Sequence, residues 1–88
     1  MEKSIFSDSY SLFLQELKEA RQKAGLTQEE LAERLQQTQS FVSKCERGER
    51  RLDIVEVRAF CIALGIPFGF FIAQFDQAII EQTGRIQK

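Results

Sequence analysis

Two consecutive helix-start signals, eleven residues apart, constrain the fold of this 88-residue chain more than any other feature. Thr27 precedes a short apolar-periodic stretch and is followed three positions later by Glu30, which is the sequence pattern of a capping box. Thr38 begins a second stretch after a pair of glutamines, so only about three residues separate the two predicted helices. Each threonine is followed directly by a glutamine, Gln28 and Gln39. The chain therefore has two short helices joined by a tight corner, with the same polar residue at each N-terminal end.

The segment before this corner predicts one longer helix. Apolar residues recur there at helical spacing, and the helix is expected to begin at about Asp8 or Ser9 and to run to Ala24. Gly25 follows directly and provides a C-terminal stop.

Two more helices are predicted after the corner. Asp53 with Glu56 forms a second capping box, and Gly65 ends the helix that follows. Pro67 suits the first turn of a fifth helix, which can run to about Gln82. Alternating apolar patterns typical of strands are absent from the sequence, so the prediction is an all-α fold of five helices.

The length permits one core, so a single domain is expected over residues 1–88, with a core at 10–66 and a C-terminal helix at 67–82. The residues predicted to face the core are Tyr10, Phe13, Leu14, Leu17, Ala20, Ala24, Leu31, Ala32, Leu35, Val42, Cys45, Val57, Phe60, Cys61, Leu64, Phe68, Phe71, Ile72, Phe75 and Ile79.

Composition excludes several classes of protein. The chain is 43% apolar and 28% charged, no apolar run reaches the roughly 20 residues of a membrane helix, and the N-terminus lacks a secretion signal, so a cytoplasmic protein is expected. It has no histidine and no Cys-x-x-Cys, which argues against a metal site, a cofactor and enzymatic catalysis. Cys45 and Cys61 could pair, but their helix-interior positions favour buried free thiols.

The net charge of −1 is a mild argument against nucleic acid as a partner. Charge is unevenly distributed, however, and residues 38–51 carry four cations against two acids: Lys44, Arg47, Arg50 and Arg51 against Glu46 and Glu49. A small basic edge on a nearly neutral protein is the better description.

The helix after Thr38 has one polar face. At about 100° per residue, one arc of roughly 140° collects five hydrogen-bond donors and no acid: Gln39, Ser40, Ser43, Lys44 and Arg47. Such side chains have the chemistry to contact base edges in a DNA major groove, where glutamine pairs with adenine. The alternative is an ordinary solvated face. Phe41 lies at the border of the arc, where it either packs partly or contacts a thymine methyl group or a sugar.

The span from Leu17 to Ile66 resembles the helix-turn-helix domain of the phage repressor and Cro family, also called Xre-type regulators. Several positions carry this resemblance jointly: the Leu26-Thr27-Gln28 entry, Ala32, the Thr38-Gln39-Ser40 start, Val42, and the pattern S-x-x-E-x-G from Ser43 to Gly48. The resemblance implies a five-helix repressor-like DNA-binding domain in which helices 2 and 3 form the helix-turn-helix, with the second of them in the major groove.

Residue roles follow from the same resemblance. Base contacts are expected from Gln39, Ser40, Ser43 and Lys44, and phosphate contacts from Gln28, Arg47, Arg50 and Arg51. Arg21 and Glu46 correspond to a buried structural ion pair in many relatives. Gln36 stands at the corner where relatives commonly have glycine, so a strain of roughly 1 kcal/mol is expected there.

The fifth helix has a second apolar seam outside its core stripe, made of Phe70, Ala73, Gln77 and Ile80. Two seams on one terminal helix suggest a homodimer, although Phe70 could instead merely cover loops.

The leading hypothesis is a homodimeric transcriptional regulator, expected to be a repressor, that binds double-stranded DNA at a palindromic operator. The alternative is an antitoxin-like or restriction-controller-like protein whose C-terminal helix binds a protein partner. No small-molecule ligand is evident from the sequence.

Overall fold

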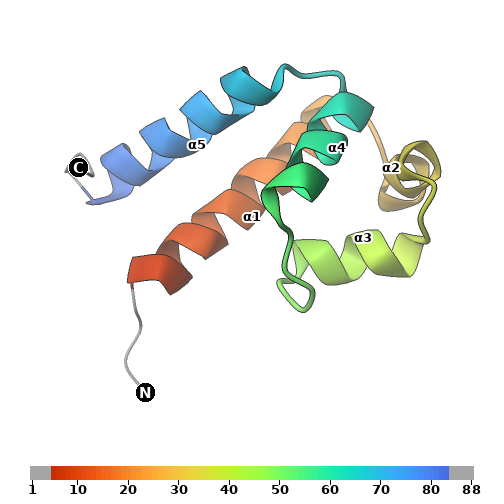
Figure 1. The fold of residues 1–88 in the computed structure, drawn as a ribbon, viewed down its shortest axis with the longest axis horizontal. Helices are drawn as coiled ribbons and strands as arrows, with labels where there is room; N and C mark the ends of the chain where they lie inside the picture. Colours follow the sequence, from red (N-terminus) through yellow and green to blue (C-terminus); the bar gives the residue numbers. More distant parts are fainter. Residues whose placement is uncertain (1–4, 84–88) are drawn as a thin grey trace.

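The computed structural model of the protein describes residues 5–83, and this part of the chain consists of five α-helices and their connections (Figure 1). The helices are α1 (Ile5–Lys23), α2 (Gln28–Leu35), α3 (Gln39–Glu46), α4 (Ile54–Leu64) and α5 (Phe68–Thr83). The all-α class and the number of helices predicted from the sequence are confirmed.

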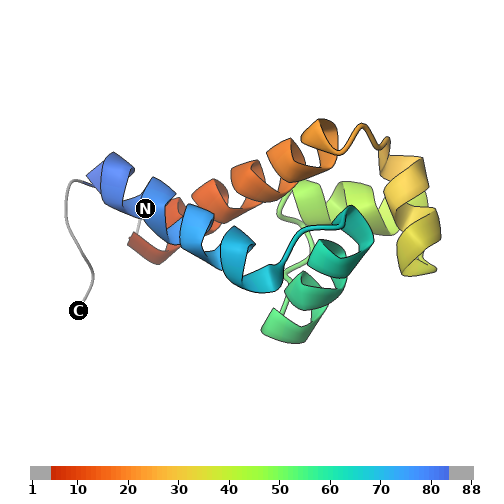
Figure 2. The same ribbon diagram turned by 90° about the horizontal axis from the view of Figure 1, so that it is seen from above.

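The two long helices, α1 and α5, lie side by side, while α2 and α3 form the opposite end of the molecule (Figures 1 and 2). Helix α4 contacts both α2 and α5, and α1 also contacts α3. The α2–α3 pair is therefore held from behind by α1 and α4, and its outer side points away from the rest of the protein.

The predicted helix starts are present in atomic detail. The Thr27 hydroxyl accepts from the backbone N–H of Glu30, and the Glu30 carboxylate accepts from the backbone N–H of Thr27, which completes the capping box of α2. Asp53 and Glu56 form the same reciprocal pair at the start of α4. These side chains satisfy backbone donors that have no partner within a helix, so they define where each helix begins.

The corner between α2 and α3 is made by Gln36, which adopts the left-handed conformation with φ 58° and ψ 44°. Thr38 then caps α3 by accepting from the backbone N–H of Phe41 at 3.0 Å. The left-handed corner expected from the resemblance is therefore formed, with glutamine in a conformation that costs a non-glycine residue about 1 kcal/mol or more.

One core connects all five helices, and the side chains buried most deeply in it are Leu17, Leu31, Val42, Cys45, Phe60, Cys61 and Phe71. Phe13 of α1 contacts two rings of α5, with centroid distances of 6.2 Å to Phe71 and 5.9 Å to Phe75. Both cysteines are buried and free, as predicted.

Three sequence predictions need correction. Helix α1 begins at Ile5 and not at Asp8 or Ser9. Asp8 lies within the first turn of the helix, and the helix dipole favours an acid there just as an N-cap position does. Ile72 was expected in the core but is 39% exposed, because it lies at the rim of a shallow cavity between α1, α4 and α5. Ala24 follows the last residue of α1 and is exposed.

Within the described residues, no single helix has the length and apolar composition needed to cross a membrane. Helices α4 and α5 meet those criteria only when they are taken together across a bend of 110°.

Candidate nucleic-acid interface

Helix α3 exposes the polar arc that its sequence predicts. Val42 and Cys45 are fully buried on its inner side, whereas four of the five polar residues on the arc are exposed and Ser43 is partly exposed. The exposed members are Gln39, Ser40, Lys44 and Arg47. Helix α3 itself lies at the edge of the molecule (Figure 1), and the exposure of these four residues leaves the arc open to another molecule.

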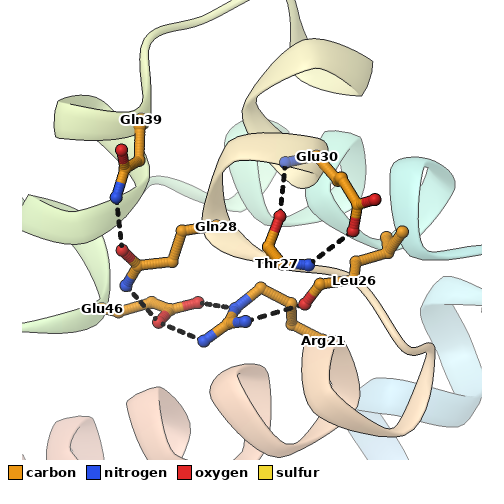
Figure 3. Close-up of polar contacts among 7 residues, drawn as sticks. All are labelled: Arg21, Leu26, Thr27, Gln28, Glu30, Gln39 and Glu46. Carbon is orange, nitrogen blue, oxygen red and sulfur yellow. Dashed lines mark hydrogen bonds and ion pairs between the residues drawn. The ribbon is translucent and has the colours of Figure 1, made fainter.

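The two glutamines that follow the capping threonines lie next to each other (Figure 3). Gln39 Nε2 donates to Gln28 Oε1 at 3.4 Å, and Gln28 Nε2 donates to Glu46 Oε1 at 3.0 Å. The N-terminal ends of α2 and α3 are therefore joined by side chains, and both amides are part of one hydrogen-bond network.

The inner end of this network is an ion pair between α1 and α3. Arg21 Nε donates to Glu46 Oε2 at 2.6 Å, and Arg21 Nη2 donates to Glu46 Oε1 at 3.1 Å. The side chains are only 10% and 4% exposed, so the pair expected from the resemblance is present and buried. Arg21 Nη1 also donates to the backbone carbonyl of Leu26 at 2.8 Å, which fixes the connection between α1 and α2 (Figure 3).

Arg47, at the C-terminal end of the arc, has partners within its own loop. Its Nε donates to Glu49 Oε2 at 2.9 Å, and its Nη1 donates to the Ser43 hydroxyl. The hydrogen bond and charge of Arg47 lower the pKa of the exposed Glu49 carboxyl. Arg47 is therefore exposed, as a phosphate contact requires, but an internal carboxylate partly neutralises it.

Arg50 is similarly engaged. It forms an ion pair of 2.8 Å with Glu56, whose pKa is lowered chiefly by that hydrogen bond, and it also donates to the backbone carbonyl of Arg51. Its guanidinium lies 5.0 Å from the centre of the Phe41 ring. Phe41 is partly buried, with its centroid 6.4 Å from that of Phe60, so its ring packs partly against the core.

Arg51 has a different environment. Its guanidinium stacks 4.1 Å from the centre of the Tyr10 ring, and among the described residues it has no carboxylate partner. The Tyr10 hydroxyl accepts from the backbone N–H of Leu52 at 3.1 Å, so α1 holds the loop that follows α3. Arg51 is consequently a positioned cation whose charge is not offset within this part of the chain.

A family model described as helix-turn-helix matches residues 17–71, which include all of α2, α3 and α4. A solved structure described as an XRE-family like protein from Pseudomonas syringae pv. tomato str. DC3000 is 43% identical over 84% of this chain and 90% of that one, with a TM-score of 0.80.

The chain belongs to the Xre-type helix-turn-helix family.

Two further structures resemble this Xre-type chain in fold. The wild-type restriction-modification controller protein C.Esp1396I is 24% identical over 90% of this chain and 99% of that chain, with a TM-score of 0.78. The clp gene regulator ClgR from C. glutamicum is 23% identical over 80% of this chain and 91% of that chain, with a TM-score of 0.70. No curated protein sequence matches the chain. Family membership identifies a DNA-binding transcription regulator.

The seam predicted on α5 of this Xre-type protein lies at the surface. Phe70 is 56% exposed, Ala73 and Gln77 are exposed, and Ile80 is partly buried. Phe70 lines a groove between α1 and α5 together with the acids Glu16 and Glu19. Burial and the neighbouring Glu19 raise the pKa of the Glu16 carboxyl.

Several side chains of this Xre-type protein that contact the predicted interface residues were not predicted from the sequence. Glu49 and Glu56 pair with the arginines expected to contact phosphate, and Tyr10 supports Arg51 from α1. The Arg47–Glu49 pair spans two positions and could have been suspected from spacing. Contacts between distant segments, such as that of Gln28 with Glu46, become visible only in the fold.

Proposed function

We propose that this regulator is a sequence-specific repressor that binds a palindromic operator as a homodimer, with α3 of each protomer in the major groove. In this proposal Gln39, Ser40, Ser43 and Lys44 contact bases. Phosphate oxygens are bound by Gln28, Arg47, Arg50 and Arg51. The observation that carries the proposal is the exposed donor-rich arc of α3 on a helix whose other side is fully buried.

The geometry of Gln28 supports its phosphate role. It is the first residue of α2 and lies at an N-terminus where backbone N–H groups favour an anion. Its side chain also contacts Gln39, so a phosphate held at α2 would place the neighbouring base pair close to the start of α3.

Selection of binding sites from random duplexes tests this function. The expected result is an inverted repeat whose half-sites are centred about 34 Å apart, one turn of B-DNA. Gln39→Ala should then flatten the base preference at one position in each half-site, while Arg51→Ala should weaken binding to all sequences alike. Recovery of no common sequence would contradict the proposal.

The homodimer in this proposal uses the α5 seam. Phe70 is a large exposed apolar side chain on α5, and burying it against a second copy would remove apolar surface from water. Sedimentation should show a dimer for the wild-type protein and a monomer for Phe70→Glu. Val55→Glu is the matched control, because Val55 is 73% exposed on α4 and lies outside the seam. A wild-type monomer at tens of micromolar would contradict this part of the proposal.

A different protein bound at the same seam is the second candidate, because Phe70 would suit either partner. Co-purification of a distinct protein with wild-type chain but not with Phe70→Glu would favour it.

A DNA ligand places the protein in the compartment that holds the DNA, so the proposed location is cytoplasmic.

A further inference from the structure

The buried Glu46 carboxylate has hydrogen-bond donors on both of its oxygens. Its Oε2 accepts from Arg21 Nε, and its Oε1 accepts from Arg21 Nη2 and from Gln28 Nε2. An ionised carboxylate can only accept hydrogen bonds. The Gln28 amide must therefore present its N–H side to Glu46, because the opposite orientation would place the amide oxygen against a negative oxygen.

This constraint fixes the outer side of Gln28. With Nε2 turned inward, Oε1 faces α3 and accepts from Gln39 Nε2 at 3.4 Å (Figure 3). Gln28 Nε2 carries two N–H groups and donates one of them to Glu46. The second remains available for a phosphate oxygen, which also can only accept hydrogen bonds.

The constraint then passes to Gln39. Because Gln28 offers an oxygen, the Gln39 amide must turn its nitrogen toward α2 and keep one N–H and its Oε1 for another partner. Adenine presents the complementary pair in the major groove, with N7 as an acceptor and N6–H as a donor. Guanine presents two acceptors there, N7 and O6, so the Gln39 oxygen would oppose O6.

We infer that Glu46, held by Arg21, is a positioning residue that sets the donor and acceptor polarity of both glutamines and thereby selects adenine at the base pair contacted by Gln39. Glu46 itself does not touch DNA in this scheme. The inference rests on the proposed function, since it requires that Gln39 contact a base.

The test is the substitution Glu46→Gln in the 88-residue chain. A glutamine has the same length and shape, but it can offer Gln28 either an N–H or an oxygen, so the polarity of the network is no longer fixed. Binding constants are measured for operator variants with each base pair at the position where Gln39→Ala flattens the preference. Wild-type protein should favour adenine over guanine there on the order of tenfold, and Glu46→Gln should lose most of that ratio.

The double variant Glu46→Gln with Gln39→Ala separates positioning from general damage. If Glu46 acts through Gln39, Glu46→Gln should change the adenine-to-guanine ratio in the wild-type background and leave it unchanged in the Gln39→Ala background. Leu64→Ala is the control for lost stability, because it removes a buried side chain of α4, away from the network. Its adenine preference should equal that of the wild type at a temperature where all variants are folded.

A second variant keeps the test decisive if Glu46→Gln does not fold. Gln28→Ala cuts the link between Glu46 and Gln39 but leaves the Arg21–Glu46 pair in place, and it should lose the adenine preference as well. A folded Glu46→Gln protein with full adenine preference would overturn the inference, as would full preference in Gln28→Ala.

These outcomes differ from failure of the proposed function. If Gln39→Ala leaves the base preference unchanged at every position, base contact by Gln39, and with it that part of the proposed function, is wrong and the inference falls with it. If Gln39→Ala flattens one position while Glu46→Gln and Gln28→Ala keep the wild-type ratio there, only the role of Glu46 is wrong.

Discussion

Neutralising Glu49 should make DNA binding tighter and more sensitive to salt. Arg47 Nε donates to Glu49 at 2.9 Å, and both side chains are about half exposed, so the carboxylate offsets a cation on the edge that is proposed to face phosphate. Glu49→Gln removes the offsetting charge and keeps the size of the side chain. The internal pair can no longer compete with phosphate for Arg47.

The structure gives the size of the change. Three cations are proposed to contact phosphate, Arg47, Arg50 and Arg51, and two of them are paired with Glu49 and Glu56. Each net positive charge that neutralises a phosphate changes the slope of log association constant against log salt by about −0.9. A net charge of one predicts a slope of about −0.9 per protomer, and Glu49→Gln should steepen it to about −1.8.

Fluorescence anisotropy with a labelled duplex of unrelated sequence, over salt concentrations from about 50 to 200 mM, measures this slope. Glu19→Gln is the matched control, because it makes the same change in total charge at an exposed position of α1. It should leave the slope close to the wild-type value. An unchanged slope for Glu49→Gln, or an equal steepening for Glu19→Gln, would refute the placement of phosphate on the α3 edge.

Three predictions concern stability and the thiols. Gln36→Gly should raise the free energy of unfolding by about 1 kcal/mol in urea, because glycine adopts the left-handed corner without steric cost; a lower value would show that the corner is not strained. Arg21→Ala should lower the free energy of unfolding by about 3 to 5 kcal/mol, because the substitution leaves Glu46 charged and buried without its partner. An unchanged melting temperature would contradict this prediction. Cys45 and Cys61 should resist a thiol-specific reagent until the protein unfolds, because burial raises the pKa of both thiols; rapid labelling of native protein would argue against it. Because the pKa of each thiol is higher in the folded protein than in the unfolded chain, the two buried neutral thiols contribute fully to stability below about pH 8.5. This contribution is lost as the pH rises through the pKa of the folded protein.

Local signals predicted most of the fold. The boxes at Thr27 and Asp53 fixed the starts of α2 and α4 because a cap and its reciprocal partner are only three residues apart, so the sequence contains the whole interaction. The predicted start of α1 is three or four residues too late, since Asp8 favours a first turn as well as a cap.

Tertiary contacts were harder to predict. The exposure of Ile72 depends on how closely α1 and α4 approach α5, which periodicity along a single helix does not contain. The resemblance gave the Arg21–Glu46 pair, but the contact between Gln28 and Glu46 joins residues 18 positions apart through the α2–α3 corner. The Arg50–Glu56 pair was likewise not predicted, because it joins the loop after α3 to α4 and periodicity along a single helix does not contain it.

The central claim is that the polar arc of α3 enters the major groove. Dimethyl sulfate footprinting on the selected operator tests it directly, since the reagent methylates guanine N7 in the major groove and adenine N3 in the minor groove. Wild-type protein should protect guanine N7 in both half-sites and leave adenine N3 reactive, and Gln39→Ala should weaken binding to that operator. Protection of adenine N3 with guanine N7 still reactive would place the protein in the wrong groove and contradict the account.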